Sequence, residues 1–446
     1  MNVRSSFKFT LVLLLLLVGG LVGCSSNDNE DNEKSNNEGN SGGEVSGELE
    51  IQYFVGGYGD AWWKNIIEEF EEKYPDVTVI EHAGSNINDE MRTRWISGNP
   101  PDFVYLGGAG MNEAKMIEDG QLMELTDWVN EVELDDGSLL MDEFLVPPHK
   151  YEDDKVYSIP YIFDTWGIWY DKAWFDREGF EVPTDFDSWM DSMKTIQEKE
   201  DISPFTTTGM YAYYFLNGVL HSGFGTVGGD ELLADITLGK EGAWTSEEAL
   251  TVLERVQEIR DAGFIDPGFA GINHTQSQMN FLNHKNAYIP VGFFLPNEMK
   301  EDVPEDFEFG FLPPPLNGED EQMVLIPEVG SFGIAKDAEN PEAAKAFGEL
   351  VFSEANATAL AILSGGLPNI KDVDLQDNPD VPPHLKDVDE FVNISDEVEL
   401  NYLPQQMSED LRNPIMDALV SFMLGEIDAE DFAQKAEEAA EKYRNK

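Results

Sequence analysis

Strand-like and helix-like patterns alternate between residues 48 and 106, and this alternation restricts the fold more than any other feature. The stretch ELEIQYFV predicts a strand from Glu48, and Asp60 is a suitable N-cap for a helix from Ala61 to Tyr74. The next stretches, VTVIEH, INDEMRTRWISG and PPDFVYLG, predict a strand, a helix and a strand. Because strands that alternate with helices usually pair in parallel, we expect an α/β fold with a mostly parallel sheet.

Later helices carry clear end signals. Thr245 and Glu248 predict a capping box at the start of one helix, and Gly263 is suited to end it. Asn340 and Pro341 predict the N-cap and first position of another helix. The stretches SEDLRNPIMDALVSFMLGEI and DAEDFAQKAEEAAEKYRNK predict two further amphipathic helices.

Residues 158–172, SIPYIFDTWGIWYDK, form the most aromatic strand pattern. Two apolar runs, Ile159 to Phe163 and Trp166 to Tyr170, surround the polar pair Asp164-Thr165. An unpaired charge in a protein core is strongly unfavourable. Either another group therefore pairs with Asp164, or the backbone there lines a cavity.

The charge balance is strongly acidic. The 446 residues include 88 Asp and Glu against 28 Lys and Arg, a formal net charge of −60. Since phosphates are bound by clustered Lys and Arg, this excludes a general nucleic-acid or anionic-membrane partner. We interpret the acidic surface as an adaptation that keeps the protein hydrated at high salt or high pH. The 41% hydrophobic content and the length suffice for two or three domains with cores of their own.

The N-terminal segment predicts export and a lipid anchor. Arg4 and Lys8 lie near an apolar run, Leu11 to Val18, that is too short to span a membrane. The following Leu21-Val22-Gly23-Cys24 resembles a bacterial lipobox, so we expect residues 1–23 to be a signal peptide and Cys24 to carry lipid. The alternative is a signal peptide that is discarded whole. Cys24 is the only cysteine, which excludes an intrachain disulfide, and residues 24–47 predict a disordered acidic tether.

Motifs for catalysis and metal binding are missing. The sequence has no HExxH, P-loop or CxxC, no GxSxG occurs from Glu48 onward, and its six His are scattered. The acidic stretch at Asp372, Asp374, Asp377 and Asp380 lacks the glycine and terminal glutamate of an EF-hand, so a solvated face is favoured over a weak calcium site. We therefore expect no cofactor, no metal and no enzymatic activity.

Aromatic residues gather beside turns and polar residues. Sugars suit such a lining, because their C–H faces stack on aromatic rings and their hydroxyls need fixed polar partners. For each aromatic residue, packing in the core is the alternative. The group comprises Tyr58, Trp62, Trp63, Tyr105, Trp166, Tyr211, Tyr213, Tyr214, Phe293 and Phe294, together with Asp164.

Five ordered blocks from Glu48 onward resemble the extracellular solute-binding proteins, family 1, of carbohydrate ABC transporters. Some positions depart from the family pattern: Asp171 replaces an Asn, Trp189 is delayed, residues 283–285 lack a Gly, and Phe294 replaces a Trp. The blocks are NPPDFVYLGGAGMNEAKMIEDGQLMELTDWV, DDKVYSIPYIFDTWGIWYDKAWFDREGFEVPTDFDSW, TQSQMNFLNHKNAYIPVGFF, IPEVGSFGIAKDAENPEAAKAF and GGLPNIKDV.

The resemblance implies a two-lobed, periplasmic-binding-protein-like α/β fold with a ligand cleft between the lobes. The chain would cross the hinge near Pro160 to Asp164 and return near Pro327 to Ser331. Lobe 1 would then comprise residues 48–163 and 330–365, and lobe 2 residues 164–329 and 366–446.

The resemblance also implies a function. The chain would be the substrate-binding component of an ABC importer, a monomer on the extracellular face of the membrane that delivers a carbohydrate to a permease. The stretches INHTQSQMNFLNHKNAYIPVGFFLPNEM and GMYAYYFLNGVLHSGFG are most similar to binders of N-acetylglucosamine and chitobiose, with other oligosaccharides open. Alternatives are a lipid-anchored glycoside-active enzyme, a binder of a non-sugar solute and a surface adhesin.

Eight residues are the predicted sugar contacts. Asp164 matches the acidic residue that the family uses on sugar hydroxyls, and Phe294 matches its aromatic platform. Tyr211 and Tyr213 match an aromatic stretch of lobe 2, where we expect an extended segment whose alternate residues face one way. The remaining predicted contacts are Trp62, Tyr105, Trp166 and Glu328.

Overall fold

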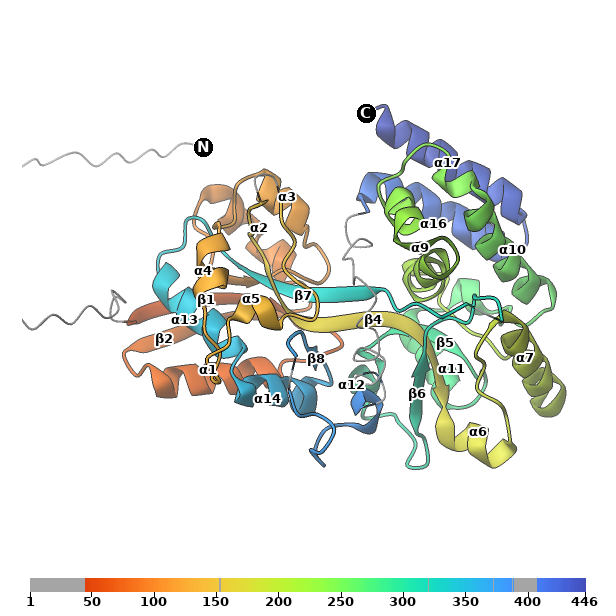
Figure 1. Ribbon diagram of the computed structural model, residues 1–446, viewed down its shortest axis with the longest axis horizontal. Helices are drawn as coiled ribbons and strands as arrows, with labels where there is room; N and C mark the ends of the chain where they lie inside the picture. Colours follow the sequence, from red (N-terminus) through yellow and green to blue (C-terminus); the bar gives the residue numbers. More distant parts are fainter. Residues whose placement is uncertain (1–44, 152–153, 320, 372, 387, 389–406) are drawn as a thin grey trace, which may run out of the picture. The chain divides into compact units, whose positions relative to one another are not determined.

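The computed structural model describes residues 45–151, 154–319, 321–371, 373–386, 388 and 407–446 (Figure 1). The predicted signal peptide and Cys24 lie outside the described residues, as do most of the predicted tether and Asp372. Among the described residues, no single helix is long and apolar enough to cross a membrane, although one pair bent by 72°, Pro341–Val351 with Glu354–Ser364, meets that test jointly.

In the part of the chain that the structure describes, eight strands form one mixed sheet in the order β2-β1-β3-β7-β4-β5, and β6 and β8 also pair with β4. Strand β1 is parallel to β2 and β3, whereas β7 and every partner of β4 are antiparallel to their neighbours. The prediction of a mostly parallel sheet is therefore wrong. Two strands that cross in opposite directions, β4 outward and β7 back, must pair antiparallel. The strands are β1 (Gly47–Phe54), β2 (Val77–Gly84), β3 (Phe103–Tyr105), β4 (Ile159–Asp171), β5 (Ile289–Gly292), β6 (Phe309–Leu312), β7 (Pro327–Ile334) and β8 (Leu367–Pro368).

Strand β4 joins two regions of this sheet. Its first half pairs with β7, with Pro160 opposite Ser331 and Thr165 opposite Pro327. Its second half pairs with β5 and β6. Figure 1 shows β4 and β7 running side by side. The two apolar runs around Asp164 therefore belong to a single strand of 13 residues, and the two predicted hinge segments pair with each other.

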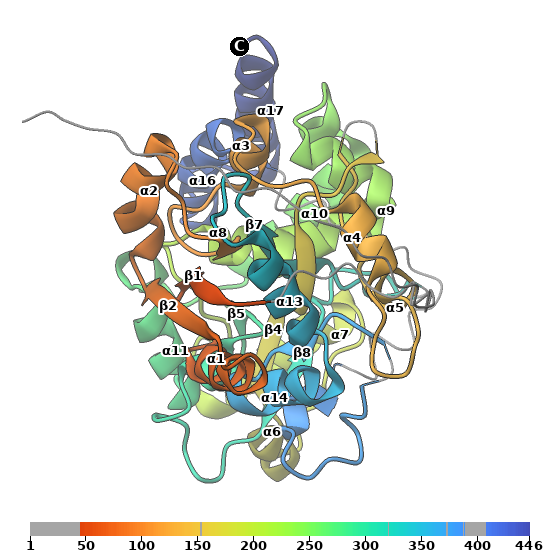
Figure 2. The ribbon, with the colours of Figure 1, turned by 90° about the vertical axis from the view of Figure 1, so that its left-hand side faces the viewer.

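The helices around β1 and β2 form the first apolar core. Helices α1, α13 and α14 of this region face the viewer in Figure 2. Helix α1 buries Trp62, Trp63, Ile66 and Phe70. Asp60 is the N-cap residue as predicted, but its side chain pairs with Lys64 and makes no capping hydrogen bond. The helices of this region are α1 (Ala61–Lys73), α2 (Ile87–Ser97), α3 (Glu113–Glu118), α4 (Thr126–Glu131), α5 (Leu140–Glu143), α13 (Pro341–Val351) and α14 (Glu354–Ser364).

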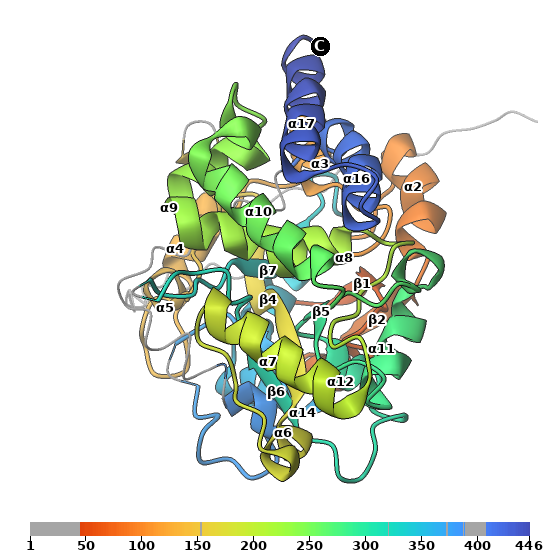
Figure 3. The same ribbon diagram turned by 90° about the vertical axis from the view of Figure 1, so that its right-hand side faces the viewer.

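The second region is built on β4, β5 and β6, is mostly helical (Figure 3), and buries its side chains in more than one apolar cluster. Its α-helices are α6 (Lys172–Glu178), α7 (Phe186–Glu200), α8 (Tyr213–Phe215), α9 (Ser222–Thr237), α10 (Glu247–Asp261), α11 (His274–Leu282), α12 (Leu295–Glu298), α16 (Glu409–Met423) and α17 (Ala429–Arg444). The region also has a π-helix, η2 (Leu216–His221), and two 3-10 helices, η3 (Ala243–Thr245) and η4 (Phe269–Gly271).

The predicted helix ends are mostly confirmed. Asn340 caps α13 by accepting a hydrogen bond from the Ala343 amide, and Gly263 follows the end of α10 with a φ of 74°. The capping box at Thr245 is wrong by one residue. Thr245 still belongs to η3, and Ser246, with an extended backbone, accepts the hydrogen bond from Ala249.

The segment after α14 returns to the crossing strands. Leu367 pairs with Phe163, and Ile370 forms a bridge with Phe144. This segment therefore contacts β4 and the first core before the chain reaches α16. The predicted lobe boundary between residues 365 and 366 stays a prediction.

Candidate functional site

The Asp164 carboxylate lies in β4 and is held by backbone amides. Its Oδ1 accepts hydrogen bonds from the Thr165 nitrogen at 2.8 Å and from the Phe293 nitrogen at 3.1 Å. Among the described residues, no Lys, Arg or His forms an ion pair with it. Burial raises the pKa of Asp164 to about 6, although hydrogen bonds from the Thr165 amide, the Tyr58 hydroxyl and the Phe293 amide act in the opposite direction. Neither amide donates a hydrogen bond to the second carboxylate oxygen, Oδ2.

Two tyrosine hydroxyls are buried close to this carboxylate. The Tyr58 hydroxyl makes no hydrogen bond of standard geometry with the described part of the chain. Burial, followed by the neighbouring Asp164 charge, raises the pKa of Tyr58 well above its ordinary value. The same two causes raise the pKa of Tyr105, and Glu328 adds to them. The Tyr58 hydroxyl in turn lowers the pKa of Asp164, so the hydroxyl and the carboxylate face each other.

Glu328 of β7 lies directly across from Asp164 of β4. Side chains of opposed residues project from the same face of an antiparallel pair, so the two carboxylates share one face. Glu328 accepts hydrogen bonds from the Trp166 indole nitrogen at 2.7 Å and from the Asn217 amide at 3.3 Å. Like charges placed opposite each other lower stability. A fold that keeps both carboxylates here, without a cation paired to Asp164, has a pattern typical of a binding site.

Aromatic rings continue from this polar centre. Phe294, directly after β5, lies edge-on to Tyr58 with ring centroids 6.1 Å apart and edge-on to Trp166 at 5.5 Å. A Cβ atom on Gly57 would lie 2.6 Å from the Phe294 ring, so this close approach requires glycine. The Asn297 amide nitrogen, in α12, donates to the Gly57 carbonyl at 2.7 Å. The loop after β1 and the turn after β5 are thus in direct contact.

The structure brings most of the predicted contacts together. Asp164, Trp166 and Glu328 are linked by pairing and hydrogen bonds, Tyr105 is close enough for its pKa to respond to both carboxylates, and Phe294 packs against Trp166.

Trp62 is not part of this group. It is 2% exposed, its indole nitrogen donates to the Asn356 carbonyl at 3.0 Å, and its ring stacks on Tyr161. Its position in the first turn of α1 turns the ring into the first core, which the amphipathic pattern of that helix also explains.

The segment that carries Tyr211 and Tyr213 is a turn leading into α8, which corrects the prediction of an extended chain. In such a tight turn the two rings are brought close together, with centroids 6.2 Å apart. They are 39% and 37% exposed. Tyr213 also lies edge-on to Trp166 at 6.1 Å, so the pair still adjoins the site.

Sequence reasoning did not select three participating groups. Asn217 lies in the π-helix η2, and the sequence carries no signal for that turn. The Phe293 amide acts through the backbone, which leaves no signature in side-chain identity. Tyr58 was identified as an aromatic beside a turn, and this position could have placed it among the contacts.

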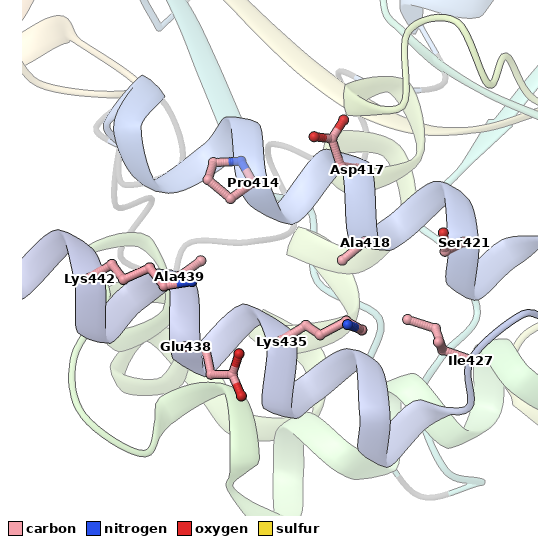
Figure 4. A pocket seen from close by; sticks show the side chains of 9 residues that line it. All are labelled: Pro414, Asp417, Ala418, Ser421, Ile427, Lys435, Glu438, Ala439 and Lys442. Carbon is pink, nitrogen blue, oxygen red and sulfur yellow. The ribbon is translucent and has the colours of Figure 1, made fainter.

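Other regions of the described chain are weaker candidates for a ligand-binding site. Among the residues that the structure describes, no group of three His, Cys, Asp or Glu could hold a metal ion. A hollow of about 450 Å³ lies between α16 and α17 (Figure 4). Its lining mixes lysines with acids and has no aromatic ring, and it consists of Pro414, Asp417, Ala418, Ser421, Ile427, Lys435, Glu438, Ala439 and Lys442.

Comparison with known proteins identifies the family. The sequence profile of the family described as "Bacterial extracellular solute-binding protein" matches residues 56–358. The chain belongs to this family. The predicted resemblance is confirmed, and the family is extracellular by its description.

Relatives are similar over part or most of this solute-binding protein. The "Diacetylchitobiose binding protein NgcE" of Streptomyces coelicolor is 24% identical over 270 residues, which are 59% of this chain and 56% of the relative. The "Multiple sugar-binding protein" of Streptococcus mutans is 25% identical over 56% of this chain and 58% of the relative. The chain thus spans little more than half the length of these two. "Diacetylchitobiose binding protein DasA" of Streptomyces coelicolor is 22% identical over 81% of this chain and 82% of the relative.

Solved structures show the fold. A "Chitin oligosaccharide binding protein" has a TM-score of 0.71 and 18% identity, covering 90% of this chain and all of the other. The apo form of RafE from Streptococcus pneumoniae has a TM-score of 0.68 and 20% identity, covering 90% and 99% of the two chains. The two-lobed α/β fold predicted from the sequence is confirmed, with β4 and β7 as its crossing strands.

Proposed function

We propose that this solute-binding protein is the substrate-binding component of an ABC importer. It captures a carbohydrate outside the cell and delivers it to a membrane permease. Family membership supports the class, and the names of three relatives support a sugar ligand. The observation that carries the proposal is the Asp164 carboxylate, fixed by two amides beside the buried Tyr58 hydroxyl and the Phe294 and Trp166 rings.

The chemistry of these groups suits a sugar. A hydroxyl of the ligand would donate to Asp164 Oδ2 and accept from Tyr58, so one sugar group would satisfy both. The rings of Phe294 and Trp166 would pack against the C–H face of the same unit. Two of the relatives named above are diacetylchitobiose-binding proteins, so we propose N-acetylglucosamine and its β-linked oligomers as the first ligand class.

The site draws on both sides of the crossing strands. Tyr58 follows β1 and Tyr105 is the last residue of β3. Trp166 lies in the second half of β4, and Phe294 follows β5. A sugar that contacts both sets would stabilise the closed arrangement of the lobes, because it binds that state more tightly than the open one.

Calorimetry with purified protein tests the proposal. We expect chito-, xylo- or malto-oligosaccharides to bind the wild type, and Asp164→Ala and Phe294→Ala to weaken binding by about tenfold or more, since a charged hydrogen bond contributes about 1.5–3 kcal/mol. If no sugar binds the wild type while amino acids or peptides do, the solute is not a carbohydrate.

The opposed carboxylates of Asp164 and Glu328 favour one alternative, a glycoside-active enzyme, which needs such a pair. Long incubation of the protein with each bound oligosaccharide, followed by chromatography, separates the two functions. We expect the sugar to be recovered intact, and cleavage that Glu328→Gln abolishes would establish the enzyme.

We also propose that lipid on Cys24 anchors the protein at the extracellular face of the membrane, where it works as a monomer beside its permease. The lipobox-like Leu21-Val22-Gly23-Cys24 supports the anchor. Membrane fractionation should recover the wild type with membranes and Cys24→Ala in the medium. Equal release of both proteins would exclude a lipid anchor.

A further inference from the structure

We propose that Tyr211, Tyr213 and His274 form an outer sugar-binding subsite that continues from the Asp164 site, so that the protein distinguishes oligosaccharides by length. The inference rests on the proposed sugar-binding function. The aromatic contacts of the Asp164 site continue beyond Trp166. Successive ring centroids lie 6.1 Å apart from Trp166 to Tyr213, 6.2 Å from Tyr213 to Tyr211 and 5.3 Å from Tyr211 to His274.

Exposure separates these tyrosines from the other aromatic residues. Eight large hydrophobic side chains are exposed among the described residues. Only two of these eight, Tyr211 and Tyr213, are aromatic. Met210, beside them, is 60% exposed. Trp166 and Tyr214, at the inner end of the same ring contacts, are 7% and 5% exposed. The ring series therefore runs from a buried end at the Asp164 site to an open end at Tyr211, and a chain of sugars could lie along it.

Polar groups at the open end could hold sugar hydroxyls. Glu298, the last residue of α12, accepts a hydrogen bond from the Gln278 amide at 2.7 Å and lies 3.8 Å from the His274 ring nitrogen. The side-chain oxygen Oε1 of the buried Gln278 has no hydrogen-bond partner in the described part of the chain. An imidazole, a carboxylate and an amide thus accompany the exposed rings.

Short-range geometry connects the inner and outer parts. Phe294 is the N-cap residue of α12, and its carbonyl accepts a hydrogen bond from the Glu298 amide at 2.9 Å. A single helical turn therefore fixes the inner aromatic platform relative to the outer carboxylate. On the other side, α8 carries Tyr213 and Tyr214, and both pack edge-on against Trp166. Each ring step of 5–6 Å is comparable with the length of one sugar unit.

Calorimetry with a length series tests the outer subsite. Chito-, xylo- and malto-oligosaccharides of one to four units would be titrated into the wild type, Tyr211→Ala and Phe294→Ala. We expect Tyr211→Ala to weaken binding of the longer members by roughly five- to tenfold while the shortest ligand that binds is unaffected. Phe294→Ala should weaken binding at every length. Leu424→Ala, which removes an exposed side chain at the end of α16, is the matched control and should change nothing.

The outcomes separate this inference from the proposed function. An equal effect of Tyr211→Ala at all lengths, or none at any length, would overturn the outer subsite while sugar binding stands. Wild-type protein that binds only single sugar units would do the same. Wild-type protein that binds no sugar of any series would overturn the proposed function as well. Because Tyr211 is exposed, the melting temperature of the Tyr211→Ala protein should equal that of the wild type. Equal melting temperatures exclude misfolding as the cause of weaker binding.

Discussion

At the scale of single residues, Asp164 shows what the sequence could and could not reveal. A carboxylate inside an aromatic strand indicated either a partner or a cavity, and the structure supplies two backbone amides and no cation in the described chain. The amides could not be foreseen, because any residue can provide them. The need for some partner at Asp164 could be foreseen, since an unsatisfied charge inside a strand is too unfavourable to occur by chance.

Burial of Asp164 has a consequence for stability. Its pKa of about 6 in the folded protein is above the ordinary 3.8, so the folded state holds this proton more tightly than the unfolded chain does. Well below pH 3.8 both states are protonated. Between pH 4 and 6 the free energy of unfolding falls as the pH rises, and above pH 6 the whole destabilising contribution is present.

Asp164→Asn removes this charge, so we expect it to stabilise the protein at pH 8 by on the order of 1–2 kcal/mol and by less at pH 4.5. Urea unfolding of both proteins at the two pH values measures this, and Asp306→Asn, at a carboxylate 77% exposed, is the control. The same substitution should weaken sugar binding. A stabilising effect that is equal at both pH values would show that ionisation of Asp164 is not responsible.

Gly57 is a second residue with a testable role. Its missing Cβ admits the Phe294 ring, so Gly57→Ala should push that ring away and weaken sugar binding by roughly tenfold, as an aromatic contact is lost. Gly271→Ala is the control, because a Cβ there meets no atom within 4 Å. Calorimetry on both variants measures their affinity for sugar. Unchanged affinity in Gly57→Ala would remove Phe294 from the sugar site.

At the scale of elements, predictions succeeded where local signals fix the structure. The caps at Asn340 and the strand character of residues 159–171 follow from neighbours in sequence. Predictions failed where distant segments decide. The direction of β7 is set by its return beside β4, and Trp62 is buried because α14 supplies the Asn356 carbonyl. The turn at Tyr211 depends on packing against α11, which the local sequence does not specify.

The pairing of β4 with β7 predicts a sensitive position at Thr165. Its hydroxyl is fully buried and donates to the Ile326 carbonyl at 3.0 Å, directly before β7 begins. Thr165→Val keeps the side-chain shape but leaves that carbonyl without this donor, so we expect a loss of about 1–3 kcal/mol in the free energy of unfolding. Thr195→Val, which removes a similar bond on the surface of α7, should change stability by less than about 0.5 kcal/mol. Denaturant unfolding compares the two, and equal losses would contradict a special role for the crossing pair.

At the scale of the whole molecule, the net charge of −60 is the property that the fold does not explain. Such an excess produces self-repulsion in the compact state, which raises its free energy relative to an expanded chain. The ion pairs in the described residues include several that join neighbours on one helix, such as Lys345 with Glu342, and these relieve little of it. Salt screens repulsion between exposed charges, since the Debye length falls from about 30 Å at 0.01 M to about 3 Å at 1 M.

We therefore expect the melting temperature to rise steadily as NaCl increases from 10 mM to 1 M, the opposite of what a fold dependent on surface ion pairs would show. Differential scanning calorimetry over this range measures the effect. Sugar affinity should change far less than stability, because Asp164 is partly buried and meets a neutral ligand by hydrogen bonds, which salt screens weakly. A melting temperature that falls with salt would mean that the acidic residues are held in stabilising pairs. An affinity that changes in step with stability would mean that surface charge acts on the ligand site itself.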